Sequence, residues 1–137
     1  MNPILKNVIA VVIAIVAGYI ANMGLIMLGP NIVPLPEGMV PEDPNSIKEH
    51  MGNMQLGNFV MVWLAHAAGA FVSAFVATKI AASNSKTISL ALGGLWLIGG
   101  IMMVNMVGGP PSFIVADLVF AYIPMAYLGW ILAGKGN

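Results

Sequence analysis

Two ionisable side chains, His66 and Asp117, lie inside long apolar stretches of this sequence. A charged group at the centre of a membrane helix costs about 2.5–3.5 kcal/mol on insertion scales, so each needs a partner or a role. An imidazole can relay a proton or ligate a metal, and a desolvated carboxyl group can exchange a proton or bind a cation. Both also have structural interpretations: His66 as a neutral hydrogen-bonding group between helices, and Asp117 as a carboxylate near a Ser112 cap that reaches water.

Two asparagines, Asn22 and Asn105, are the other strongly polar side chains in apolar stretches. Counted from the ends of their segments that meet at one membrane face, the depths are about 3 Å for Asn105, 6 Å for Asp117, 9 Å for Asn22 and 10–15 Å for His66. The four side chains come from four different segments. We therefore predict a polar pocket that opens towards one face of the membrane, although hydrogen bonding between helices is the commoner role of such asparagines.

Pro124 lies near the middle of the last apolar stretch. Proline removes one backbone hydrogen bond from a helix, so this residue predicts a kink close to Asp117. A kink beside an intramembrane acid suits a transporter helix that moves, whereas a static proline kink is the commoner case.

Enzyme motifs are missing from the sequence, which has no nucleophile elbow, HExxH, P-loop or GxGxxG. There is no cysteine, which excludes thiolate metal sites and disulfides. Met39, His50, Met51 and Met54 carry groups that suit Cu(I), but their spacing matches no metal motif that we can name. We expect no cofactor, no metal and no enzymatic activity.

Four apolar stretches long enough to cross a bilayer carry these groups, at about residues 4–28, 56–78, 87–107 and 113–133. Of the 137 residues, 59% are hydrophobic and 7% are charged, whereas a soluble domain carries about 25% charged residues. Residues 29–55 form a proline-rich loop with a short helical turn expected near 47–54. We predict an all-α membrane protein, with a single transmembrane domain over residues 1–137 and four helices in an up-down bundle.

The lysines indicate how the bundle is oriented. Lys6, Lys79, Lys86 and Lys135 lie on one side of the predicted membrane, while the loop at residues 29–55 is acidic. Positively charged loops are enriched on the cytoplasmic side, so we expect both termini in the cytoplasm and the loop outside a bacterial inner membrane. Zero net charge and the lack of a basic face argue against nucleic acid as a partner.

Small residues recur at helical spacing in the first two spans. They are Ala10, Ala14 and Gly18 in the first span, and Ala65, Gly69, Ser73 and Ala77 in the second. Small residues let membrane helices approach closely. We expect these stripes to pack the bundle, or to pack it against further copies or another membrane protein within the lipid bilayer.

Several segments together resemble small four-span bacterial membrane proteins of uncharacterised function. They are MNPILKN, the proline-rich loop with PEG, LAHAAGAFVSAFVATKIA and DLVFAYIPMAYLG. The resemblance implies a four-span fold and no activity. The chain is similar to proton-coupled small multidrug exporters only in size and span number, because it lacks their glutamate in the first span.

Three functions follow from these observations. We favour a non-enzymatic, oligomeric membrane component whose external-facing polar pocket, formed by Asn22, His66, Asn105 and Asp117, binds a partner or a small ligand. The alternative is a small proton- or cation-coupled transporter that uses Asp117 and His66. A membrane enzyme built on the same two residues is the weakest of the three.

Overall fold

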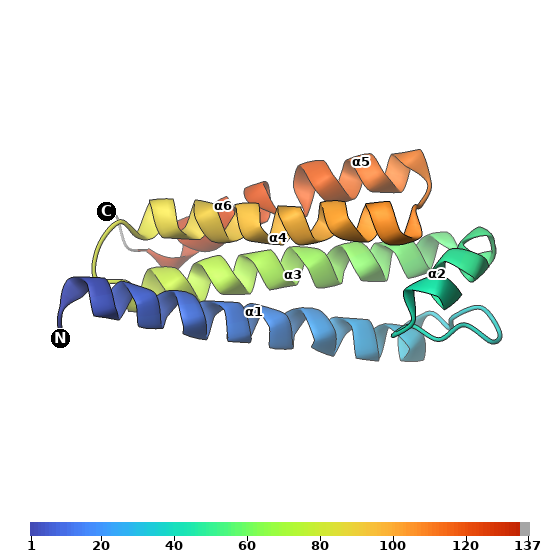
Figure 1. Cartoon of the computed structure of the whole chain (residues 1–137), viewed down its shortest axis with the longest axis horizontal. Helices are drawn as coiled ribbons and strands as arrows, with labels where there is room; N and C mark the ends of the chain where they lie inside the picture. The colour runs from blue at the N-terminus through green and yellow to red at the C-terminus, as the bar shows by residue number, and fades with distance from the viewer. Residues whose placement is uncertain (135–137) are drawn as a thin grey trace.

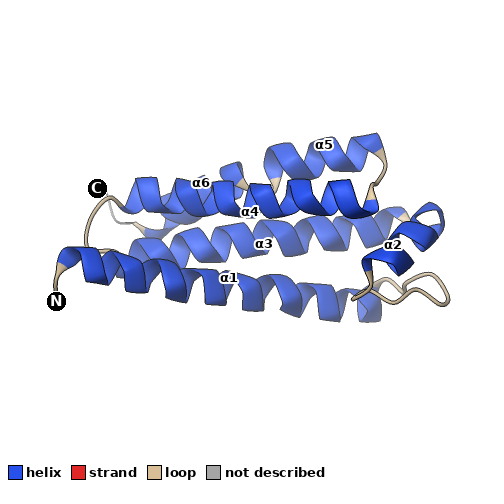
Figure 2. Ribbon diagram, in the orientation of Figure 1, coloured by secondary structure: helices blue, strands red, loops and turns tan. Residues whose placement is uncertain are grey.

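Long helices lie side by side in the computed structural model, which describes residues 1–134 (Figure 1). Every regular element in this range is helical (Figure 2). The elements are α1 (Pro3–Ile32), α2 (Pro44–His50), the 3-10 helix η1 (Met51–Asn53), α3 (Leu56–Ile80), α4 (Ser85–Val107), α5 (Pro111–Phe120) and α6 (Ile123–Ala133). By length and composition α1, α3, α4 and the α5–α6 pair can each cross a membrane. The prediction of an all-α bundle with four segments long and apolar enough to span a membrane is therefore confirmed.

Small side chains fill the inside of the bundle and large apolar ones cover the outside. Ala14, Ala65 and Ala74 are fully buried, whereas Ile20 is 64% exposed and Leu132 is 60% exposed. Apolar side chains gain little by leaving lipid, so membrane helices pack through small residues and leave their large residues to the lipid. This distribution, together with the four long apolar segments, is that of a multi-pass membrane protein.

The closest packing joins α1 to α3 and uses the predicted small-residue stripes. A Cβ on Gly18 would collide with the Ser73 hydroxyl and would lie 2.6 Å from the Gly69 carbonyl oxygen. The Ser73 hydroxyl donates to the Ala14 carbonyl at 3.0 Å and accepts from the Trp96 indole N–H at 2.9 Å. Ser73 therefore joins α1, α3 and α4 at one point inside a single chain.

The first helix is longer than the sequence predicted, because α1 continues through Pro30 to Ile32. Pro30 lies in the last turn, where it removes only the bond to one carbonyl. The residue before it is Gly29, which has no Cβ to clash with the proline ring. The turn is closed by the Val33 N–H, which donates to the Gly29 carbonyl at 2.8 Å.

The connection from α1 to α3 is partly helical and is tied to the start of α3. Asp43 caps α2 by accepting from the Asn45 N–H at 2.9 Å, so α2 begins three residues earlier than the turn expected from sequence. The Asn58 amide donates to the carbonyls of Val33 and Pro34, at 3.3 and 3.1 Å. Figure 1 shows this connection at the end of the bundle opposite the start of α1.

The fourth span is broken rather than continuous. α5 ends at Phe120, α6 begins at Ile123, and Pro124 lies in the first turn of α6. Proline has no N–H to offer the carbonyl four residues earlier, so the helix is interrupted just before it. α6 packs tightly on α3, where a Cβ on Gly129 would lie 2.5 Å from the Phe71 carbonyl oxygen. α5 stands further out, on the side of α4 away from α1 (Figure 1).

Candidate functional site

His66, Asp117 and Tyr122 form a hydrogen-bonded triangle inside the bundle. Nδ1 of His66 lies 2.8 Å from Oδ1 of Asp117. The Tyr122 hydroxyl donates to Oδ2 of Asp117 at 2.8 Å and lies 2.9 Å from Nδ1 of His66. The Tyr122 ring also stacks on the imidazole, with ring centres 5.6 Å apart. We call these three residues the triangle.

The triangle is buried on all sides but one. Asp117 is 2% exposed and Tyr122 is 1% exposed, while the His66 side chain is 19% exposed. Within residues 1–134 no group hydrogen-bonds to Nε2 of His66, and this nitrogen is not among the buried unpaired atoms. Nε2 is therefore the atom through which the triangle can exchange a proton with its surroundings.

The break in the fourth span is what brings Tyr122 to Asp117. Residues five apart on a continuous α-helix point about 140° away from each other, so these two side chains would not meet. Here α5 ends with the Ala121 N–H on the Asp117 carbonyl at 3.0 Å, and Tyr122 has φ −111° and ψ −76° before α6 begins. The chain turns at this point and directs the phenol back to the carboxyl group.

A glycine on α4 makes room for the phenol. A Cβ on Gly100 would collide with the Tyr122 hydroxyl and would lie 2.6 Å from the ring carbon that carries it. Ala67 and Ala70 of α3 pack against the same tyrosine. The position of the hydroxyl is therefore set by contacts from two other helices as well as by the helix break.

Charge determines which protonation states of the triangle suit a membrane. With Asp117 ionised and His66 doubly protonated, the pair has zero net charge. Moving the proton along the 2.8 Å contact to Oδ1 gives two neutral groups, again with zero net charge. Losing the proton from Nε2 leaves one negative charge, which is expensive inside lipid unless a cation offsets it.

The two predicted asparagines are placed differently by the structure. Asn22 is buried at 9% exposure, and its Nδ2 has no hydrogen-bond partner. Its Cβ lies 3.1 Å from where a Cβ on Gly69 would be, one turn along α3 from His66. Asn105 lies on the exposed face of α4 near its end, and the structure does not bring it to the triangle. Depth along a span does not reveal which face a residue occupies, so we leave Asn105 out of the site.

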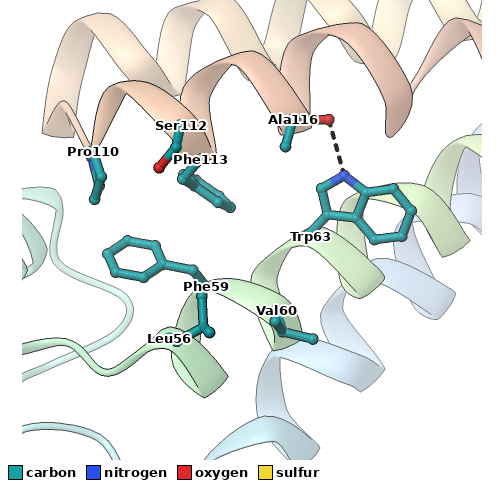
Figure 3. A pocket seen from close by; sticks show the side chains of 8 residues that line it. All are labelled: Leu56, Phe59, Val60, Trp63, Pro110, Ser112, Phe113 and Ala116. Atoms are coloured by element: carbon teal, nitrogen blue, oxygen red, sulfur yellow. Dashed lines mark hydrogen bonds between the residues drawn. The ribbon is translucent and has the colours of Figure 1, made fainter.

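Near the triangle the structure also shows an apolar groove. The groove lies between the first turns of α3 and α5 and has a volume of about 470 Å³. Figure 3 shows that Trp63 closes its inner end by donating from the indole N–H to the Ala116 carbonyl, at 3.0 Å. The lining residues are Leu56, Phe59, Val60, Trp63, Pro110, Ser112, Phe113 and Ala116.

Sequence reasoning found His66 and Asp117 but missed Tyr122 and Trp63. The proline at position 124 was the one signal for Tyr122, since a break there changes the direction of every side chain around it. Trp63 gave no signal, because a tryptophan in an apolar helix is unremarkable by itself. In the part of the chain that the structure describes, no three His, Asp or Glu side chains are grouped as metal ligands.

No protein-family model, curated protein or solved structure matches this chain. Four helical segments long and apolar enough to cross a membrane indicate a small four-span membrane protein. Of the resemblance noted in the sequence, the four-span architecture is supported, and no family is identified.

Proposed function

We propose that this protein is a small proton-coupled transporter of the bacterial inner membrane, with no enzymatic activity, that loads and releases a proton at His66. The observation that carries the proposal is the direct contact between the only histidine and the only acidic residue in the four spans. Two such residues would each be costly alone, and together they hold one proton at zero net charge. This favours the transporter over a pocket that only binds a partner.

The broken fourth span supports the same proposal. Asp117 belongs to α5, and Tyr122 lies in the link before α6, so the triangle joins the break to α3. In many transporters, interrupted helices form the substrate site around which the parts of the protein move. Loss of the proton changes the charge on the residues that hold α5 to α3, which couples protonation to the position of α5.

The proposed orientation follows the lysines. Lys6 lies in the first turn of α1, Lys79 in the last turn of α3 and Lys86 in the first turn of α4. These helix ends lie at the end of the bundle opposite the acidic connection between α1 and α3 (Figure 1). With the lysine-rich end in the cytoplasm, the triangle lies in the outer half of the membrane.

Infrared difference spectroscopy on the full chain in lipid tests the proposal. We expect the carboxyl bands of Asp117 and the imidazole bands of His66 to change together in one transition as pH is varied. The Asp117→Asn and His66→Ala variants should each abolish the whole transition. A carboxyl band that does not respond to pH, or that titrates unchanged in His66→Ala, would refute a shared proton.

A purely structural role of the triangle predicts a different result in the same experiment. Both Asp117 oxygens are hydrogen-bonded, so the triangle also holds α5 against α3. If that were its only role, His66→Ala would lower the thermal stability of the bundle and no pH-dependent bands would exist in the wild-type chain.

A further inference from the structure

The groove between α3 and α5 has one polar side chain among eight lining residues. That side chain is Ser112, at the outer end. The remaining walls are aliphatic or aromatic, and Figure 3 shows Phe59 of α3 next to Phe113 of α5. Their ring centres are 5.0 Å apart, and their planes are tilted by 46°. A ligand in this groove must therefore be largely apolar.

The inner wall of the groove is shared with the triangle. Trp63 lines the groove and also packs against the buried cluster that contains Tyr122. On the other side, Ala116 lines the groove and directly precedes Asp117 in α5. Trp63 and the α5 backbone at Ala116 therefore form the wall between the groove and the triangle.

The charge on this side of the bundle favours a positive ligand. Asp117 is the only acidic residue in the four spans, and the lysines at Lys6, Lys79 and Lys86 are at the opposite end. The faces of Phe59, Trp63 and Phe113 carry the negative part of the ring quadrupole, which attracts organic cations. No positive side chain lines the groove.

We propose that the groove binds a lipophilic cation, meaning a quaternary ammonium, a phosphonium or an aromatic cation with apolar substituents. This inference rests on the proposed function and names its substrate class. The positive charge in the groove offsets the negative charge that the neighbouring pair acquires when it loses its proton, so cation binding and protonation of the pair oppose each other. Binding therefore strengthens as pH rises, because a rising pH removes that proton.

The groups that face His66 support this pH dependence. Asp117 and Tyr122 are its ionisable contacts, from the α5–α6 segment. On α4, Gly100 packs against Tyr122 and Trp96 packs against Gly69, one turn from His66, and neither carries a charge. On α1, the uncharged Asn22 packs against the same Gly69. Only the pair can supply the charge that a cation neutralises.

Two ions of the same shape and opposite charge provide the test. Radiolabelled tetraphenylphosphonium is equilibrated with the purified full chain in detergent, and tetraphenylborate is used as the competitor. We expect saturable binding of one cation per chain, tighter at high pH, with no competition from the anion. Asp117→Asn should weaken binding by about tenfold or more, since it removes the attracting charge in a low-dielectric site.

Aromatic variants keep the test decisive if Asp117→Asn fails to fold. Phe113→Leu removes a ring from the groove, whereas Phe71→Leu removes one from α3 outside it. We expect weaker cation binding in Phe113→Leu and unchanged binding in Phe71→Leu. Equal competition by tetraphenylborate would mean that the groove accepts any apolar molecule, such as a lipid chain, and would overturn the inference.

Failure of this inference is distinguishable from failure of the proposed function. Suppose that the cation does not bind, or that the anion competes equally, while the joint infrared transition of His66 and Asp117 is observed. This result would refute the lipophilic cation as ligand and leave the proton site intact. Absence of that infrared transition removes the proton site itself and, with it, the opposition between protonation and cation binding.

Discussion

At the scale of single residues, the hydroxyl of Tyr122 has the clearest role. It donates to Asp117 and lies within hydrogen-bonding distance of His66, so it fixes the second carboxyl oxygen and leaves the first for the imidazole. A carboxylate with two donors needs no water to satisfy it. The triangle can therefore stay dry until Nε2 exchanges its proton.

Tyr122→Phe removes this donor and leaves the ring in place. A hydrogen bond to a charged group contributes about 1.5–3 kcal/mol, so we expect a loss of this order in the free energy of unfolding. Thermal or denaturant unfolding of the purified chain in detergent measures it. Tyr127→Phe is the matched control, because Tyr127 lies on the exposed face of α6. Equal stability of the two variants would contradict the role given to Tyr122.

At the scale of helices, the close packing of α1 on α3 depends on glycine, which has no side chain to keep the two helices apart. Gly18 has the Ser73 hydroxyl and the Gly69 carbonyl directly above it, whereas Gly24 of the same helix has no atom within 4 Å of an added Cβ. The two glycines thus differ in their surroundings and share their helix.

Gly18→Ala should separate α1 from α3 and lower stability by about 1–3 kcal/mol, the usual cost of overpacking. Gly24→Ala should leave stability unchanged or raise it, because alanine is the better helix former. Unfolding curves of the two variants, recorded under one condition, make the comparison. An equal effect of both substitutions would contradict close packing of α1 on α3 at Gly18.

The break in the fourth span belongs to the same scale. Pro124→Ala restores an N–H for the carbonyl of Phe120 and favours a continuous helix. A continuous helix would turn Tyr122 away from Asp117, so we expect the joint infrared transition to shift or disappear. Pro111→Ala is the control, because Pro111 lies in the first turn of α5, where a backbone N–H has no partner within the helix. This substitution should leave the spectra unchanged. Identical spectra for wild type and Pro124→Ala would show that the break does not position Tyr122.

The elements themselves were largely predictable from the sequence, and the site only in part. The spans follow from apolar length, and the small residues on the inner faces follow from their four-residue spacing. Tyr122 could not be placed beside Asp117, because a helix break changes the phase of the side chains by an amount that no pattern reveals. Asn105 was assigned to a pocket by its depth, although the structure puts it on an exposed face.

At the scale of the whole molecule, the orientation in the membrane decides which compartment the triangle serves. The chain has no cysteine, so single cysteines can be introduced on a clean background. Glu42 lies in the acidic connection, and Ala82 lies in the turn between α3 and α4; both are exposed. We expect an impermeant maleimide to label Glu42→Cys in intact cells and Ala82→Cys only after the membrane is opened. The reverse pattern would place the triangle near the cytoplasm.

The central claim is that His66 loads and releases its proton at Nε2 while Nδ1 stays bonded to Asp117. Nitrogen-15 magnetic resonance of labelled histidine in the full chain tests this directly, with His50→Gln used to assign the second histidine. We predict that Nε2 of His66 changes its protonation state with pH and that Nδ1 keeps the signature of a strong hydrogen bond throughout. A His66 whose Nε2 never changes, or whose Nδ1 titrates as the free nitrogen, would contradict the account.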